Sequence, residues 1–355
     1  MLDFNYFSAL ESCWERLKNA DLPIFIYGMG DGCNKILAKF EELGIGCDGI
    51  FASDEFVRGH EFAGFKVQRY SEVLKDHKNF IIVPAFGTSL PDVMTRLENM
   101  AENHTLIMPD TPVIGSECFD KNQFLARFSQ AEKVYNLLAD DLSKQVFVSI
   151  LSYKISGDIS CLKQIFTSPD EAYDNILSLG GKETYVDLGA FTGDTVLEFL
   201  NHTKGSYNKI YALEPDKKNF RKCVANLLHL NNIELHNAAS WKCDQLKAFC
   251  GNSGRQGKLS DEGKLTRCRS VDSILSGNDC TYIKFDVEGA EHESILGSID
   301  TIKKYSPKIC TALYHRAYDI IELPLLLHEI NPDYRFFIRQ YSYYPAWETN
   351  LFCIT

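Results

Sequence analysis

Residues 185–195 read YVDLGAFTGDT, an apolar run that leads into a turn with two glycines. An amphipathic helix with Val196 and Leu200 on its apolar face follows, so the order is strand, glycine turn, helix. Because glycine has no Cβ, Gly189 and Gly193 permit a sharp turn and let a ligand approach the backbone amides. The stretch predicts a nucleotide-binding turn at the carboxyl end of a buried parallel strand.

A carboxylate follows at the end of the next apolar run, where Glu214 comes after residues 211–213. A carboxylate in that place can accept two hydrogen bonds from a ribose diol, as in sites for nicotinamide cofactors and for S-adenosylmethionine. Purely structural roles are the alternative: Asp187 would cap a helix or turn, and Glu214 would be a solvated residue at a strand end. The residues alone leave the choice of cofactor open.

The order strand, glycine turn, helix also occurs near the amino terminus, from Ile24 to Leu43. Apolar runs that alternate with helical patterns predict a small parallel sheet over about 20–115. We therefore expect an α/β protein with two Rossmann-like units. The expected divisions are an N-terminal Rossmann-like domain with a leading helix at 1–120, a helical connector without clear strands at 121–182, and a second domain at 183–355. The leading helix has its apolar positions at Tyr6, Phe7, Leu10, Cys13, Trp14 and Leu17.

The second domain has seven strand candidates, the last two of which have no helix between them. This spacing predicts a mainly parallel sheet that ends in an antiparallel hairpin. Residues 243–269 are rich in Gly, Ser, Lys and Asp, which predicts a surface excursion. The strand candidates are 185–188, 209–213, 233–237, 282–286, 309–314, 335–338 and 350–354.

The composition excludes several classes of function for this chain of 355 residues. With 37 basic and 48 acidic residues its net charge of −11 would be repelled by nucleic acid or by an anionic membrane surface. There is no apolar stretch of membrane-spanning length and no signal-peptide pattern, and the 12 cysteines form no C-x-x-C pair. We expect a cytoplasmic protein without a zinc site, either monomeric or a homo-oligomer.

Four stretches, 185–195, 212–216, 237–239 and above all 283–291 (IKFDVEGAE), resemble the successive motifs of the FkbM family of S-adenosylmethionine-dependent methyltransferases. The resemblance covers about 183–355. It implies a class I methyltransferase fold with a mainly parallel seven-stranded sheet, and methyl transfer to a hydroxyl of a sugar, nucleotide-sugar or polyketide-like acceptor. The chain departs from the family at Phe191, where members often carry Asn.

Carried onto this sequence, the resemblance places the amino-acid part of S-adenosylmethionine at the glycine turn, its ribose at Glu214 and its adenine near Ala238. Trp241 could stack on the adenine, although a tryptophan there is more often part of the core or its rim. The cofactor-binding candidates are Asp187, Gly189, Ala190, Gly193, Asp194, Glu214, Ala238 and Ala239.

The catalytic candidates are Asp286, Glu288, Glu291 and His315, which follow two neighbouring strands. An imidazole or a carboxylate at that edge could take the proton of an acceptor hydroxyl, so we expect Asp286 or His315 as the base. Glu288 and Glu291 would orient the acceptor, or only favour a helix amino terminus. We predict catalysis without a metal; a divalent cation on Asp286, Glu288 and His315 is the alternative.

The first glycine turn, residues 28–33, reads GMGDGC, with Cys33 where a dinucleotide motif has its third glycine or alanine. Residues 22–116 resemble the Rossmann-like domain of bacterial sugar-modifying acyltransferases. Two other functions therefore stay open: an NAD-dependent nucleotide-sugar oxidoreductase, with Asp54 on the ribose, and a noncatalytic nucleotide-binding scaffold. Aromatic residues at 341–347 would either contact the acceptor or pack the terminal hairpin onto the body.

Overall fold

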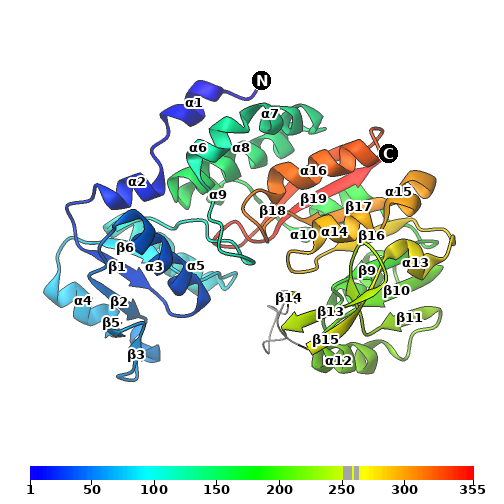
Figure 1. The fold of residues 1–355 in the computed structure, drawn as a ribbon, viewed down its shortest axis with the longest axis horizontal. Helices are drawn as coiled ribbons and strands as arrows, with labels where there is room; N and C mark the ends of the chain where they lie inside the picture. Colours follow the sequence, from blue (N-terminus) through cyan, green and yellow to red (C-terminus); the bar gives the residue numbers. More distant parts are fainter. Residues whose placement is uncertain (251–257, 260–263) are drawn as a thin grey trace.

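The computed structural model describes residues 1–250, 258–259 and 264–355. Two α/β units lie side by side, and helices from the middle of the chain join them (Figure 1). Both units are built on mainly parallel sheets, which agrees with the predicted α/β class.

The first unit contains a sheet of five strands in the order β5-β2-β1-β6-β7, with every pair parallel. The parallel sheet predicted for 20–115 is present. Its strands are β1 (Ile24–Tyr27), β2 (Gly49–Ala52), β5 (Gln68–Arg69), β6 (Ile81–Pro84) and β7 (Thr105–Leu106). The other elements are α3 (Asp31–Leu43), η1 (Asp54–Phe56), β3 (Glu61–Phe62), β4 (Phe65–Lys66), α4 (Tyr70–Asp76) and α5 (Pro91–Asn103).

The leading segment forms two short helices, α1 (Phe4–Ala9) and α2 (Cys13–Lys18), so the prediction of one helix was wrong. The first helix, α1, ends because the backbone of Leu10 is extended, and Ser12 is the N-cap of the second helix, α2. Ser12 and Glu15 form a capping box, which satisfies amide groups at the start of α2.

The middle of the chain is mostly helical, as predicted, but it also contributes β8 (Phe166–Thr167), which pairs with β18. The prediction missed this strand because two residues carry no alternation pattern. The helical elements are α6 (Lys121–Ala126), α7 (Phe128–Leu137), α8 (Asp141–Ser156), α9 (Ser160–Lys163), α10 (Pro169–Ala172) and the π-helical turn η2 (Tyr173–Leu177).

The second unit has an eight-stranded sheet in the order β11-β10-β9-β16-β17-β19-β18-β8. All seven predicted strands are present, and β19 runs antiparallel to both of its neighbours. The strands are β9 (Thr184–Leu188), β10 (Lys209–Leu213), β11 (Ile233–His236), β16 (Tyr282–Phe285), β17 (Lys308–Ala312), β18 (Arg335–Tyr341) and β19 (Thr349–Ile354). The helices are α11 (Asp194–His202), α12 (Lys217–Leu227), α13 (Val271–Leu275), α14 (Glu291–Leu296), α15 (Ile299–Tyr305) and α16 (Asp319–Ile330).

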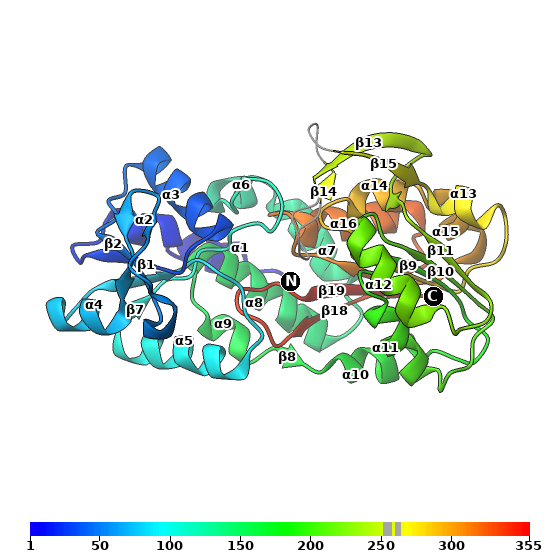
Figure 2. The ribbon, with the colours of Figure 1, turned by 90° about the horizontal axis from the view of Figure 1, so that it is seen from below.

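The described part of the predicted surface excursion contains strands and includes exposed residues such as Leu246 and Leu265. β13 (Gln245–Cys250) and β15 (Lys264–Arg269) pair antiparallel and form a small sheet with β12 (Ala239–Ser240) and β14 (Lys258–Leu259). This sheet stands off the main sheet (Figure 2). The rest of the excursion, 251–257 and 260–263, lies outside the described residues.

The two units meet at two places beside the carboxyl edge of the second sheet. Thr88 and Tyr344 exchange backbone hydrogen bonds of 2.7 and 2.9 Å, and the Ile114 amide donates to the His315 carbonyl at 3.0 Å. Gly87 packs under Trp347. Among the described residues, no helix combines the length and apolar character that crossing a membrane requires.

Candidate functional site

The glycine turn after β9 is fixed by close backbone contacts. Gly189 has φ +90°, and a Cβ there would lie 1.8 Å from the Asp286 carbonyl oxygen. Gly193 has φ +87°, and its Cβ would lie 2.8 Å from Leu227. Glycine is therefore needed at both positions for space as well as for its backbone conformation. The turn holds β9 against the end of β16, where Asp286 follows.

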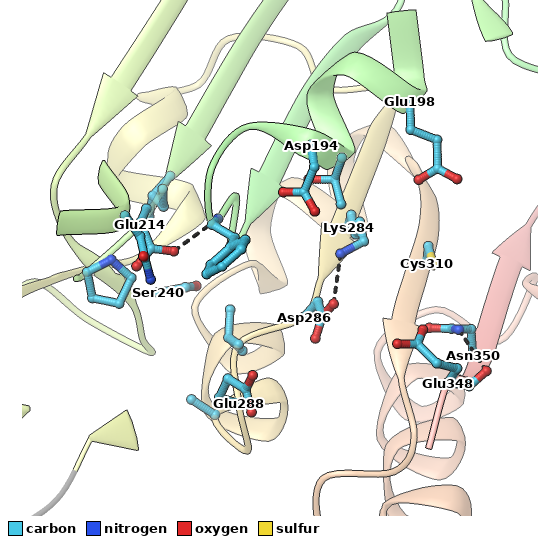
Figure 3. A pocket seen from close by; sticks show the side chains of 18 of the residues that line it. Asp194, Glu198, Glu214, Ser240, Lys284, Asp286, Glu288, Cys310, Glu348 and Asn350 are labelled. Atoms are coloured by element: carbon cyan, nitrogen blue, oxygen red, sulfur yellow. Dashed lines mark hydrogen bonds and ion pairs between the residues drawn. The ribbon is translucent and has the colours of Figure 1, made fainter. Parts of the chain in front are cut away.

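A cavity of about 320 Å³ opens at this edge, large enough for a small-molecule site. Figure 3 shows Glu214 and Ser240 at one end of it and Cys310 and Glu348 at the other. Of the cofactor candidates, Gly189, Asp194, Glu214, Ala238 and Ala239 line the cavity. The other three, Asp187, Ala190 and Gly193, lie buried in the strand and turn behind its wall.

Glu214 is 6% exposed and accepts backbone hydrogen bonds on both carboxylate oxygens. The donors are the amides of Phe191 at 3.0 Å and Asp216 at 2.8 Å. Burial raises the pKa of Glu214 to about 7, against the lowering effect of these two amides. Each oxygen keeps a second lone pair, so the carboxylate can still accept from a ligand diol.

Asp187 supports the wall of the cavity from behind. Its Oδ2 accepts a hydrogen bond of 2.5 Å from Thr195, which lines the cavity. Burial raises the pKa of Asp187 to about 6, while the charge of Lys284 acts in the opposite direction. Lys284 lies beside Asp187 in the register of β16 and β9. The motif aspartate is thus placed to position Thr195 in the wall of the cavity.

The four catalytic candidates meet, as their places after β16 and β17 predicted. His315 is 1% exposed, with Nδ1 2.9 Å from Glu291 Oε1 and Nε2 3.4 Å from Glu288 Oε2. Its Nε2 also lies 3.7 Å from Asp286 Oδ1. Asp286 and Glu288 line the cavity, whereas Glu291 is buried and its Oε1 accepts from the Val287 amide at 2.8 Å. Glu288 has φ +52°, a left-handed conformation.

His315 has little capacity to accept a proton at neutral pH. Burial alone would lower its pKa, but the charges and hydrogen bonds of Glu291 and Glu288 outweigh burial and raise it well above the usual value. An imidazolium already carries a proton on both nitrogens. His315 is therefore suited to hold the two glutamates in place.

Asp286, Glu291 and His315 offer ligand atoms that all lie within 4.8 Å of one another. Carboxylate and imidazole ligands suit several divalent cations. This set overlaps the alternative metal site inferred from the sequence, with Glu291 in place of Glu288. A metal would have to displace the proton that His315 holds between the glutamates.

The far end of the cavity was missed by the sequence analysis, apart from the aromatic group that includes Tyr341. These residues come from α10, η2, α11, β17 and the terminal hairpin, and no local motif marks them. They are Pro169, Tyr173, Glu198, Cys310, Tyr314, Tyr341, Glu348, Asn350 and Phe352. Trp241 lies elsewhere, with the Lys247 ammonium 4.0 Å from its ring centroid.

Packing explains two of the three glycines of the first turn, Gly28 and Gly32. A Cβ on Gly28 would lie 2.6 Å from the Phe86 ring, and one on Gly32 would lie 2.3 Å from the Ala85 carbonyl oxygen. Asp54 accepts a hydrogen bond from the Ser71 amide at 3.1 Å, and the side chain of Ser71, together with this amide, lowers the pKa of Asp54. These glycines therefore do not by themselves indicate a bound dinucleotide.

Residues 187–343 match the family model described as the methyltransferase FkbM domain. The chain is also similar to the crystal structure of a methyltransferase FkbM from Methylobacillus flagellatus, with a TM-score of 0.72 and 17% identity over 95% of this chain and 91% of that one. The two share a fold across both units.

Two further structures match part of the chain. An rRNA methylase from Streptococcus thermophilus has a TM-score of 0.36 and 14% identity over 53% of this chain and 97% of that one. Aeropyrum pernix fibrillarin with natively bound S-adenosyl-L-methionine has a TM-score of 0.32 and 10% identity over 50% of this chain and 69% of that one. No curated protein matches the chain.

Proposed function

Since residues 187–343 match the model of the methyltransferase FkbM domain, we propose that this protein binds S-adenosylmethionine in the cavity beside Glu214 and methylates a hydroxyl oxygen of a small acceptor. The observation that carries the proposal is the continuity of one cavity from Glu214 to Asp286 and on to Glu348. When bound, the cofactor supplies a methyl group on a cationic sulfur; transfer to a hydroxyl leaves a neutral thioether and one proton.

The residues at one end of the cavity fit the cofactor. Glu214 keeps acceptor capacity on both oxygens for a ribose diol. Ala238 and Ala239 are small enough to leave room for a flat ring, and Gly189 exposes backbone at the turn. We assign Asp187 to positioning Thr195, and Ala190 and Gly193 to shaping the turn.

We propose Asp286 as the base in preference to His315. Asp286 lines the cavity, and Lys284 donates to its Oδ2 at 3.0 Å. His315 is held as an imidazolium by Glu288 and Glu291 and has no lone pair to offer. A positioned base typically contributes about 10²- to 10⁴-fold, and alignment of the reactants up to roughly 7–11 kcal/mol.

Glu288 lines the cavity beside Asp286 and is placed to accept a hydrogen bond from the acceptor. It has a left-handed backbone conformation, the ring of His315 lies beside its carboxylate, and the next residue, Gly289, has φ +84°. We assign Glu291 and His315 to maintaining this turn.

The test is thermal unfolding with S-adenosylhomocysteine, with NAD and with neither. At about 100 times its dissociation constant a ligand of the native state adds roughly 2.7 kcal/mol, which moves the transition by several degrees. We expect S-adenosylhomocysteine to stabilise the wild type and the surface control Glu329→Gln, but not Glu214→Ala. A response to NAD alone would refute the proposal and favour the oxidoreductase.

A second measurement tests the base. Asp286→Asn keeps the shape of the side chain and removes its ability to take a proton. We expect this variant to retain S-adenosylhomocysteine binding and to lose about 10²-fold or more in turnover. Full turnover in the variant would remove Asp286 from the mechanism.

A further inference from the structure

The cavity continues past Asp286 on the side away from Glu214. Figure 3 shows Lys284 and Asp286 between its two ends, with Cys310, Glu348 and Asn350 beyond them. The residues at this acceptor end come from the connector, from α11, from β17 and the residues after it, and from the terminal hairpin. If the cofactor lies beside Glu214, as the proposed function requires, the acceptor must occupy this end.

The lining of the whole cavity is strongly acidic. Among the described residues it contains seven carboxylates, and Lys284 is its single lysine or arginine. Lys284 lies 3.0 Å from Asp286, and the charges of Asp286 and Asp187 raise its pKa although burial acts to lower it. Its charge is therefore largely balanced by those two carboxylates and is not offered to an anionic ligand.

Glu198 and Glu348 bring this acidity to the acceptor end. Burial raises the pKa of Glu198, against the charge of Lys284, which shows that the carboxylate is poorly solvated there. A bound cation would favour the ionised form of such a group, and a bound anion would be repelled by it.

Aromatic rings complete the acceptor end. Tyr173, Tyr314, Tyr341 and Phe352 line it, and Tyr173 is only 6% exposed. Aromatic faces attract cations and pack against the carbon faces of sugars. Carboxylates and aromatic rings around one enclosed space match an ammonium group on a hydroxylated ring better than they match a phosphate.

We propose that the acceptor end takes a hydroxylated molecule that carries a protonated amine, as an amino sugar does, and that it rejects phosphorylated and carboxylated acceptors. The proposal rests on the proposed function, because it assumes that the cofactor fills the other end. It narrows the acceptor class and excludes nucleotide-sugars, whose diphosphate is anionic.

Calorimetry on protein saturated with S-adenosylhomocysteine tests this charge preference, at neutral pH and low salt. The probes are glucosamine, N-acetylglucosamine and glucose 6-phosphate, which share a ring and differ in charge. We expect glucosamine to bind about tenfold or more tightly than N-acetylglucosamine, and glucose 6-phosphate to bind most weakly. The double variant Glu198→Gln/Glu348→Gln should lose the preference, and Glu329→Gln, which removes one carboxylate from the exposed part of α16, should keep it.

The outcomes separate the two proposals. Absence of S-adenosylhomocysteine binding would refute the proposed function itself. If S-adenosylhomocysteine binds, the charge preference is overturned by any of three results: glucosamine failing to bind at millimolar concentration, either other probe binding as tightly, or the preference surviving in the double variant.

Discussion

The buried carboxylate of Glu214 predicts a specific pH dependence of stability. In the folded protein burial raises its pKa from 4.5 to about 7. Since one pKa unit corresponds to 1.36 kcal/mol, ionised Glu214 costs the folded state roughly 3 kcal/mol. The folded state holds the proton more tightly than the unfolded chain. This cost is therefore absent below about pH 4.5 and complete above about pH 7.

Glu214→Gln removes the titration and keeps the size of the side chain. Its NH₂ group faces one of the two backbone amides that now donate to Glu214, which costs about 1–3 kcal/mol at every pH. The wild type should therefore be the more stable protein near pH 5. Its advantage should shrink by roughly 3 kcal/mol by pH 8.

Urea unfolding of both proteins at several pH values between 5 and 8 measures this difference. Asp187, whose pKa burial also raises, is present in both proteins and cancels in the comparison. A difference in the free energy of unfolding that stays constant with pH would refute the reasoning. It would mean that Glu214 is ionised as readily in the fold as in the unfolded chain.

Three further substitutions test the turns around the site, each by its free energy of unfolding. Gly189→Ala should cost about 3 kcal/mol or more, because its Cβ would overlap the Asp286 carbonyl at φ +90°; a cost below about 1 kcal/mol contradicts this. Phe191→Asn should stabilise the protein by about 1 kcal/mol, because asparagine tolerates φ +45° better; an unchanged value argues against strain. His315→Gln should cost about 3–5 kcal/mol, because it leaves the buried Glu291 without its partner; a neutral effect would show that the contact between His315 and Glu291 does not stabilise the fold.

The sequence predicted well those parts of the fold that depend on one short, continuous stretch of residues. β9 is buried along its whole length, as expected for a parallel strand covered on both faces, and its turn needs glycine where the sequence has it. The cofactor end of the cavity follows from this, since Glu214 ends the adjacent strand.

The acceptor end could not be predicted in the same way. Tyr173, Cys310 and Glu348 are far apart in the sequence and meet only because β19 inserts between β17 and β18, with η2 packed beside it. Local periodicity does not report strand order. The role of His315 was also hidden, because its pKa depends on two glutamates that the fold brings to its ring.

The N-terminal unit contacts the residues that follow β16 and β17 in the second unit. In α3, Lys35 donates hydrogen bonds to the carbonyls of Pro112 and Val113, and the next residue, Ile114, donates its amide to the His315 carbonyl. The side chain of Ile114 also fills the space that a Cβ on Gly289 would need, at 3.0 Å. This loop therefore contacts the residues next to the turn that follows the proposed base, Asp286. The first unit contributes to the geometry of the site even though two of the three glycines in its own turn are accounted for by packing.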